Sequence, residues 1–338
     1  MNSSFVVDGR EIGPDQATFI VAELGINHNG DPQIAHQMIE AAAAAGADAV
    51  KLQTYRTKSL LAEGNPYYEI FRQSEMSDLD TLRELKQHAE NLGVVLISSA
   101  SDMPGLEILI DLDVPMIKLS SANITNLPLL RAVAQTGKPL IFSSGGATLA
   151  ELTQAAETVE VAGAKAVAIL KCTSIYPCPP EHVNLKGLHT LRAVFDCPIG
   201  FSDHTTGIEA AIAAVALGAC IIEKHFTLDR SMEGHDHHFS ADRDELSRLV
   251  DGVRSVEAMR GSDRLEPVGE EIEFLRVGRR YVTAAVDIPE GSVIHAAMIS
   301  VRRPQGEPGI PPANVDVVIG RSTRRSVKAG ESIRWEDI

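Results

Sequence analysis

Eight short runs rich in branched aliphatic residues recur between residues 19 and 226, at intervals of roughly 25 residues. Amphipathic stretches rich in alanine and leucine alternate with them, as at 32–46 and 148–163. Eight such units are typical of a parallel sheet that closes as a (β/α)8 barrel. A doubly wound open sheet is the alternative, but no glycine-rich dinucleotide or Walker-type loop supports it. The predicted strands are 19–23, 48–54, 94–99, 115–120, 139–144, 166–172, 198–202 and 219–226.

Polar residues gather at the carboxyl ends of these predicted strands. In a parallel barrel those ends surround one cavity, where the active sites of this fold lie. One polar strand end could be a satisfied structural group, whereas eight in register favour a site. The residues are Glu23, Lys51, Gln53, Ser98, Ser99, Lys118, Ser143, Ser144, Lys171, Ser202 to His204, and Glu223 to His225.

Two lysines within this set lie inside apolar runs. An unpaired ammonium at Lys51 or Lys118 would be costly to bury, so a structural salt bridge would explain either lysine taken alone. Several serines at neighbouring strand ends favour a different interpretation, in which lysines and hydroxyls together bind an anion such as a phosphate group. These serines are Ser99, Ser121, Ser143 and Ser202.

Two histidines end the seventh and eighth predicted strands, which are neighbours in a closed barrel. His204 and His225 could share a divalent metal, and a hydrogen-bonding or acid–base role is the alternative. Asp236 follows in a histidine run that we expect to be mostly solvated, and its loop can reach the same cavity. Glu23 could hold a sugar hydroxyl or move a proton, and a proline-rich loop presents Tyr176.

The chain has 338 residues and a formal net charge of −15, which argues against general nucleic-acid binding. Its first residues, MNSSFVVDGREIG, lack the apolar core of a signal peptide, and no apolar run is long enough for a membrane span. We therefore expect a cytoplasmic protein that binds neither membranes nor nucleic acid. Its four cysteines are expected to be reduced thiols. They are Cys172, Cys178, Cys197 and Cys220.

Two segments depart from the barrel pattern. The stretch 55–78 follows the second strand and predicts a substrate-contacting loop, with a surface excursion as the alternative. After residue 265, short segments separated by proline and glycine predict a compact β-rich domain over 279–338. The sequence thus indicates a catalytic barrel at 1–265 and a linker at 266–278. The tail is dense in arginine, at Arg302, Arg303, Arg321, Arg324 and Arg325.

Several motifs in order, among them FIVAELGINHNGD, GADAVKLQT, CTSIYPCPPEHVNL, GFSDHTTG and IEKHFTLDR, resemble the sialic acid synthase family. The tail is similar to the antifreeze-like (SAF) domain of that family. The resemblance implies a transferase that condenses phosphoenolpyruvate with an N-acylated hexosamine, by default N-acetylmannosamine, to form a nonulosonic acid and phosphate. The alternative acceptor is a 2,4-diacetamido-trideoxyhexose, as in legionaminic or pseudaminic acid synthesis.

The resemblance also implies roles for individual residues. Manganese, or else magnesium or cobalt, would be held by His204 and His225. The acceptor sugar would contact Glu23, Tyr176 and Asp236, and family members are domain-swapped homodimers in which an arginine, matched here by Arg303, reaches the barrel of the partner chain. Phosphoenolpyruvate would contact Lys51, Ser99, Lys118, Ser121, Ser143 and Ser202.

One departure from the family pattern falls at residue 123. The family commonly has an acidic residue in a motif like GSGE, where this chain has SSAN with Asn123. Asparagine cannot act as a base but can orient water, so the catalytic set implied is Glu23, His204 and Asn123. A non-catalytic relative that binds sugar phosphates is one alternative. A metal-dependent barrel hydrolase is another, although it would leave the lysines and serines unexplained.

Overall fold

A computed structural model describes residues 1–304 and 306–338, in which eight parallel strands form a closed barrel. Each strand pairs with the next along the chain, and the last pairs with the first, His225 lying opposite Glu23. The barrel predicted from the strand spacing is confirmed, and every predicted strand overlaps an observed one. The strands are β3 (Phe19–Gly25), β4 (Ala49–Thr54), β5 (Val95–Ala100), β6 (Ile117–Leu119), β7 (Leu140–Ser143), β8 (Val167–Cys172), β9 (Ile199–Asp203) and β10 (Ile221–His225).

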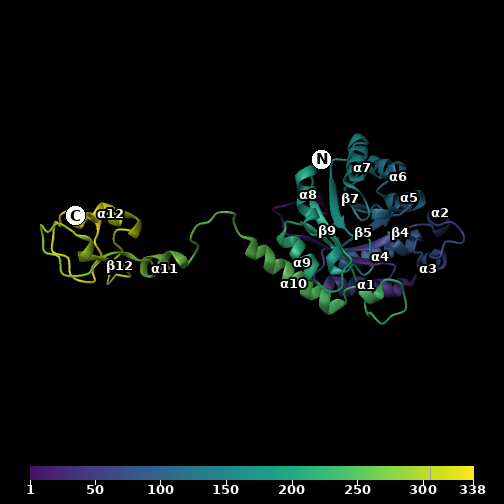
Figure 1. The fold of residues 1–338 in the computed structure, drawn as a ribbon. Coiled ribbons are helices and arrows are strands. Elements are labelled where there is room, and N and C mark those ends of the chain that lie inside the picture. The colour runs from purple at the N-terminus through teal and green to yellow at the C-terminus, as the bar shows by residue number, and fades with distance from the viewer. Residues whose placement is uncertain (305) are drawn as a thin grey trace. The chain divides into compact units, whose positions relative to one another are not determined.

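Helices surround the strands on the outside of the barrel (Figure 1). Their starts follow ordinary capping chemistry: Asp31 caps the first helix ahead of Pro32, and Thr148 forms a capping box with Glu151. The apolar faces of helices and strands meet in one continuous aliphatic cluster. The helices are α1 (Pro32–Ala44), α4 (Leu79–Asn91), α5 (Met103–Asp111), α6 (Leu127–Gln135), α7 (Leu149–Val161), α8 (Gly187–Val194), α9 (Glu209–Ala216) and α10 (Arg243–Arg260).

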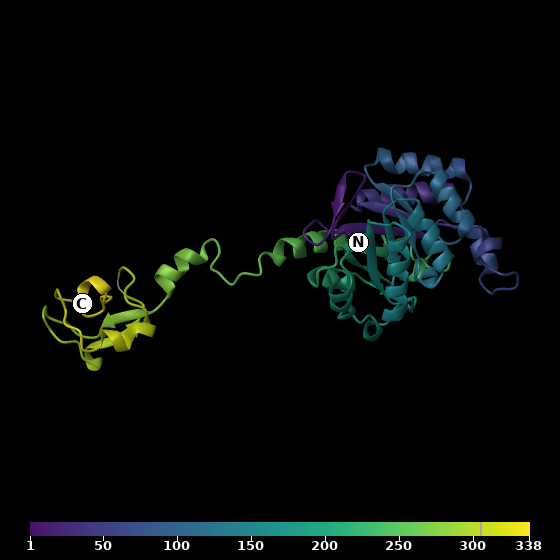
Figure 2. The same ribbon diagram turned by 90° about the horizontal axis from the view of Figure 1, so that it is seen from above.

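The interior of the barrel is apolar at its amino-terminal end. A hairpin of β1 (Phe5–Val7) and β2 (Arg10–Ile12) packs its apolar side chains against the lowest barrel residues, such as Phe19 and Val21. This hairpin is the purple segment at one side of the barrel unit in Figure 2. Charged residues inside the barrel therefore lie toward the carboxyl ends of the strands, above a closed apolar floor.

The long connection after β4 folds into two short helices, α2 (Thr57–Leu60) and α3 (Tyr68–Ser74). Its buried Tyr55 donates a hydrogen bond to the Phe71 carbonyl, with 2.9 Å between oxygens. Arg56 bonds Ser77 at 2.6 Å and pairs with Glu75 at 3.3 Å. The segment is thus anchored at its base, on the side where the strands end.

The chain divides into two compact units, Met1–Gly261 and Ser262–Ile338. The second contains an antiparallel pair, β11 (Tyr281–Ala284) and β12 (Ile299–Arg302), the short helix α12 (Val315–Val318), and a small aliphatic core. Helix α11 (Glu271–Gly278) occupies most of the stretch that the sequence indicated as a linker. Short 3-10 turns are η1 (Ser121–Asn123), η2 (Pro180–His182), η3 (His237–Phe239), η4 (Ala296–Met298), η5 (Pro312–Asn314) and η6 (Trp335–Asp337).

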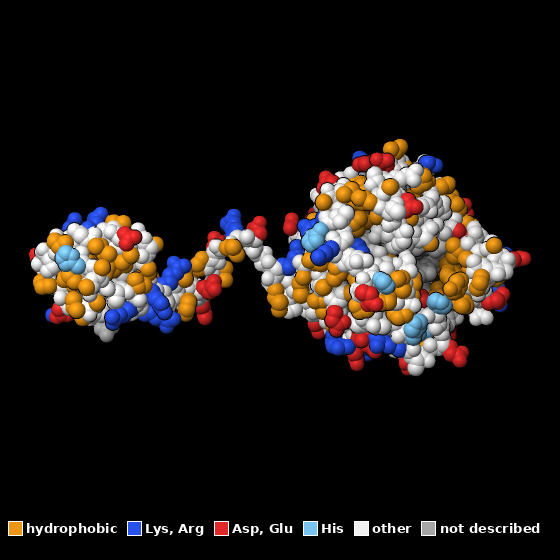
Figure 3. Space-filling view, viewed as in Figure 1, with side chains coloured by type: hydrophobic (Ala, Val, Ile, Leu, Met, Phe, Trp, Pro, Cys, Tyr) orange, Lys and Arg blue, Asp and Glu red, His pale blue; other side chains and the backbone are white. Residues whose placement is uncertain are grey.

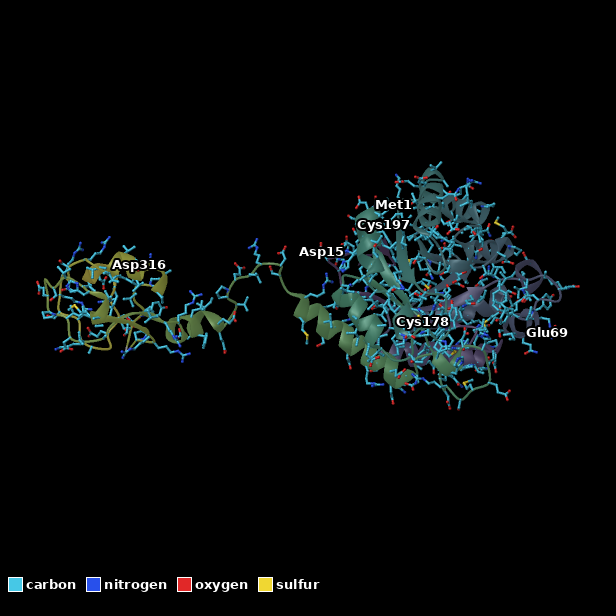
Figure 4. The ribbon with its side chains drawn as sticks, in the orientation of Figure 1. Met1, Asp15, Glu69, Cys178, Cys197 and Asp316 are labelled. Carbon is cyan, nitrogen blue, oxygen red and sulfur yellow. The ribbon has the colours of Figure 1, made fainter. Side chains whose placement is uncertain are left out.

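All four cysteines are free and buried, as expected for reduced thiols. Figure 4 labels Cys178 in the barrel unit and Cys197 near Met1, two separate places with no disulfide between them. Among the residues that the structure describes, no helix is both long and apolar enough to cross a bilayer.

Candidate active site

Four buried charged side chains, each from a different strand, meet inside the barrel. Alternate residues of a strand face the same side, and in these four strands the charged residue lies on the inner one. Lys118 donates to Glu223 at 3.1 Å, and Lys51 lies 3.6 Å from the other oxygen of that carboxylate. Lys51 also forms an ion pair with Glu23. We call these four residues the charge network. They sum to no net charge, and each is at most 6% exposed.

Serines extend the charge network on two sides. Ser202 donates to Glu223 at 2.8 Å, and Lys51 donates to the Ser99 hydroxyl at 2.9 Å. The sequence predicted that lysines and serines gather here, and the structure brings Lys51, Ser99 and Ser202 into contact through this network. Glu223 was not assigned a role from the sequence. Its position two residues before His225 on the same face of β10 was the signal that could have found it.

The two carboxyl groups of the network differ in electrostatics. Burial raises the pKa of Glu23, and Lys51 only partly offsets this. Burial would also raise the pKa of Glu223, but Lys118 and Lys51 outweigh it and hold that pKa well below its usual range. For Lys118, burial lowers the pKa despite Glu223. Glu223 is therefore a firmly ionised carboxylate, and Glu23, although paired with Lys51, has the higher pKa of the two.

Two further serines lie at neighbouring places on the barrel rim, Ser143 at the end of β7 and Ser121 in the turn η1 that follows β6. The hydroxyl of Ser143 is buried and has no hydrogen-bond partner among the described residues, which is unusual for a polar atom and is the kind of group that a ligand satisfies. The Ser121 hydroxyl accepts from the Gly145 amide at 2.9 Å. A side chain at residue 145 would lie 2.7 Å from that hydroxyl and 2.2 Å from the Ser174 hydroxyl, so glycine is required for this close approach.

His204 and His225 lie above this layer, with ring centroids 5.4 Å apart. Nδ1 of His204 is 2.8 Å from the Thr173 carbonyl oxygen, which can only accept, so in the neutral ring Nδ1 carries the proton and Nε2 keeps its lone pair. Burial would lower the pKa of His204, but the Cys172 sulfur and the Thr173 carbonyl raise it. Burial lowers the pKa of His225 to about 3, so this ring is neutral.

The histidine pair fits a divalent metal. Rings that share one tetrahedral ion have centroids roughly 5 Å apart, since each nitrogen lies about 2.1 Å from the metal. Nδ1 of His225 is buried, has no hydrogen-bond partner in the part of the chain that the structure describes, and lies 3.6 Å from Asp236 Oδ2. Among the described residues no group of three or more His, Cys, Asp or Glu side chains could hold an ion. The predicted site thus depends on the two histidines alone, and their binding of a metal stays a prediction.

Aromatic rings wall the histidines on the outer side. The Tyr176 centroid lies 4.1 Å from that of His204 and 6.1 Å from that of His225, and Phe239 lies 5.1 Å from His225. Gly25 keeps the space beside Glu23 open, because a side chain there would lie 3.2 Å from the Glu23 carboxylate. The structure thus groups Glu23, Tyr176 and Asp236 around the histidines. Figure 3 shows a hollow in the surface of the barrel unit, with histidine side chains exposed near it.

Asn123 makes two side-chain contacts. Its amide nitrogen donates to the Ser101 carbonyl at 3.2 Å, and its oxygen accepts from Asn126 at 3.1 Å. Asn126 in turn caps α6 by accepting from the Leu129 amide. Asn123 therefore ties the loop after β5 to the helix after β6, and whether it also orients a water stays a prediction.

Some strand-end residues do not face the barrel axis. Lys224 points to the opposite side of β10 from Glu223 and pairs with Asp203 at 2.8 Å. The apolar strand β10 thus ends in Glu223, Lys224 and His225. Glu223 and His225 face the site, and Lys224 has its own buried partner on the other side. In the histidine run, His235 and His238 are exposed, as expected for most of it, whereas His237 is 1% exposed and lies 2.7 Å from the Thr227 hydroxyl.

Arg303 lies in the second unit, where its side chain is exposed and donates to the Gly278 carbonyl at 3.0 Å. Its predicted contact with an acceptor sugar in the barrel of a partner chain therefore stays a prediction.

Comparison with protein families decides the wider identity. The model of the NeuB family matches residues 38–264, and that of the SAF domain matches residues 279–338. The chain belongs to the NeuB family. The expected resemblance to sialic acid synthases, with a barrel followed by an SAF domain, is confirmed.

Relatives of this NeuB-family chain include the N,N'-diacetyllegionaminic acid synthase of Legionella pneumophila, 35% identical over 100% of this chain and 99% of that protein. The human N-acetylneuraminate-9-phosphate synthase is 36% identical over 97% of this chain and 94% of its own length. A solved structure of the N-acetylneuraminic acid synthetase from Leptospira borgpetersenii is 34% identical, with a TM-score of 0.77 over 81% of this chain and 97% of that one. These similarities support an enzyme of nonulosonic acid synthesis.

Proposed function

We propose that this NeuB-family protein condenses phosphoenolpyruvate with an N-acylated hexosamine to give a nonulosonic acid and phosphate. The observation that carries the proposal is the charge network, with the unpartnered Ser143 hydroxyl on one side and the histidine pair above it. The cations and hydroxyls suit an anionic substrate, and the histidines suit the reacting carbonyl. N-acetylmannosamine is the default acceptor.

Phosphoenolpyruvate would be held by the lysines and serines. An ammonium has three N–H donors. Lys118 donates one of them to Glu223, and the others can bind a phosphate or carboxylate. Ser143 offers a hydroxyl with no other partner. Lys51 is more fully engaged, by Glu23, Glu223 and Ser99, and would orient the ligand from the other side. Because both lysines already have carboxylate partners, the site holds the anion by position rather than by excess charge.

The acceptor would lie beside Glu23, Tyr176 and Asp236. A divalent ion held by His204 and His225, manganese or else magnesium or cobalt, would supply Lewis-acid polarisation of the acceptor aldehyde. Glu23, whose pKa is raised by burial, can take or return a proton at the sugar. Carbon 3 of phosphoenolpyruvate then bonds to the aldehyde carbon, carbon 2 takes up water, and the adduct loses phosphate by cleavage of its C–O bond.

Two further features belong to the proposal. The protein would act in the cytoplasm as a domain-swapped homodimer, with Arg303 contacting the acceptor in the barrel of the partner chain. A 2,4-diacetamido-trideoxyhexose is a second candidate acceptor. The similarity to a protein named as a legionaminic acid synthase supports it about as well as the human relative supports an N-acetylmannosamine-type acceptor.

Phosphate release from phosphoenolpyruvate tests the proposal. The protein is assayed with manganese and each of three acceptors: N-acetylmannosamine, 2,4-diacetamido-2,4,6-trideoxymannose and its altrose counterpart. We expect release with one sugar and none with a chelator. His225→Ala serves as the metal-site variant, and its binding of manganese is measured directly by equilibrium dialysis. Release that needs no acceptor, or that the chelator leaves unchanged, would contradict the proposal.

A further inference from the structure

A second hollow lies beside the barrel mouth, between helices α7 and α8. It has a volume of about 500 Å³, within the range of small-molecule sites. Leu149 and Leu191 contribute an apolar wall from the two helices, and no acidic residue is among its described lining residues. We call it the α7–α8 groove. Its polar wall is formed by Ser144, Lys171, Thr173, His182, Asn184 and Thr190.

Lys171 is the feature that gives the groove its chemistry. Four of the described lysines are buried, and three of them, Lys51, Lys118 and Lys224, each pair with a carboxylate. Lys171 is 7% exposed, yet within the described part of the chain no carboxylate lies within salt-bridge distance of it. Its Nζ donates to the Thr173 hydroxyl at 2.8 Å and to the Val183 carbonyl. The third N–H of the ammonium remains for another acceptor.

A buried cation without an anion is costly, and a bound anion would offset that cost. Consistent with this, burial lowers the pKa of Lys171, and no neighbouring carboxylate opposes the shift. We propose that the α7–α8 groove binds a small organic anion, with a carboxylate or phosphate group on Lys171 and its remaining body against Leu149 and Leu191. This binding does not depend on the proposed reaction, because none of the residues assigned to the two substrates lines the groove.

The groove is also connected to the candidate metal site. Thr173 bonds Lys171 through its hydroxyl and His204 through its carbonyl, both at 2.8 Å. Cys172 lines the groove and places its sulfur 3.8 Å from Nδ1 of His204. An anion bound at Lys171 would therefore be linked to His204, a candidate metal ligand, through the single residue Thr173. We expect its binding to change the kinetics of the barrel site.

Calorimetric titration of the full chain tests the proposal with three probes: inorganic phosphate, phosphoenolpyruvate and N-acetylneuraminate. Two proteins are compared. The first carries Lys118→Met, which weakens anion binding inside the barrel, and the second carries Lys171→Met in addition. We expect at least one probe to bind the first protein, and the second change to weaken that binding about ten-fold or more through loss of the cation. Inorganic phosphate and N-acetylneuraminate distinguish a phosphate from a carboxylate ligand. Binding of none of the probes, or binding that Lys171→Met leaves unchanged, would overturn the proposal.

A second pair of variants keeps the test informative if Lys171→Met does not fold. Thr190→Glu places a negative charge on the exposed part of the groove lining, and His189→Glu places the same charge on the same helix outside it. We expect Thr190→Glu to weaken probe binding several-fold and His189→Glu to leave it unchanged. Equal effects of the two variants would overturn the assignment. A protein that binds the probe but releases no phosphate from phosphoenolpyruvate would contradict the proposed reaction and leave the groove assignment standing.

Discussion

Replacing Glu223 by glutamine tests whether the charge network holds the barrel together. The substitution keeps the shape of the side chain but changes the sum of the four network charges from zero to one positive charge. Glu223 accepts from Lys118 at 3.1 Å and from Ser202 at 2.8 Å, and is 6% exposed. Removing one partner of a buried ion pair costs about 3 to 5 kcal/mol. Because glutamine retains hydrogen-bonding atoms and Lys51 keeps Glu23, we expect the lower end, about 3 kcal/mol.

The assay is chemical unfolding followed by two signals. Far-ultraviolet circular dichroism reports the barrel, and the fluorescence of Trp335, the sole tryptophan, reports the second unit. We expect Glu223→Gln to shift the barrel transition and leave the Trp335 transition in place. The double variant Glu223→Gln with Lys118→Met should recover part of the loss, since it removes both charges. Asp113→Asn is the matched control, because Asp113 pairs with Lys138 at an exposed position and should give no resolvable change. A barrel transition that stays at its wild-type position in Glu223→Gln would refute the reasoning.

Three further predictions follow from individual contacts. Burial lowers the pKa of His28 to about 4, below its unfolded value, so its stabilisation is complete above about pH 6.5 and is lost as the pH falls toward 4. In His28→Gln, the decrease in the free energy of unfolding between about pH 6.5 and 4 should be smaller, by about 3 kcal/mol at most, as measured by unfolding at each pH. A decrease as steep as that of the wild type would contradict this prediction. Asn123→Ala should lower the free energy of unfolding by about 1 kcal/mol, because it breaks the two side-chain contacts of Asn123, and should leave the KM for phosphoenolpyruvate unchanged. A large rise in that KM would instead place Asn123 in the substrate site. Arg303→Ala should raise the KM of the acceptor more than that of phosphoenolpyruvate, and equal effects would count against the swapped dimer.

Local patterns in the sequence predicted the barrel well. Strand runs and helix caps depend on neighbouring residues, which is why strands such as β4 and β8 fall almost where the spacing placed them. Polar residues at strand ends also predicted where the site lies. Alternation decides which of them face inward, so Glu223 and His225 belong to the site, whereas Lys224 has its own partner and Lys171 lines an outer groove.

Contacts between elements that are distant along the chain could not be predicted in the same way. Lys118 on β6 and Glu223 on β10 meet across the barrel, and nothing near either residue in the sequence indicates the other. The two contacts of Asn123 likewise join separate loops. Helix α11 lies where a linker was expected. The sequence did not predict it, because a single short helix leaves little periodicity to detect.

Isotope transfer from phosphoenolpyruvate tests the central claim most directly. The bridging oxygen between carbon 2 and phosphorus is labelled with ¹⁸O, and the protein is incubated with manganese and an accepted sugar. Cleavage of the C–O bond would carry the label into phosphate, and we predict labelled phosphate that forms only when the acceptor is present. Unlabelled phosphate, formed with or without the acceptor, would mean P–O cleavage by a hydrolase and would contradict the account.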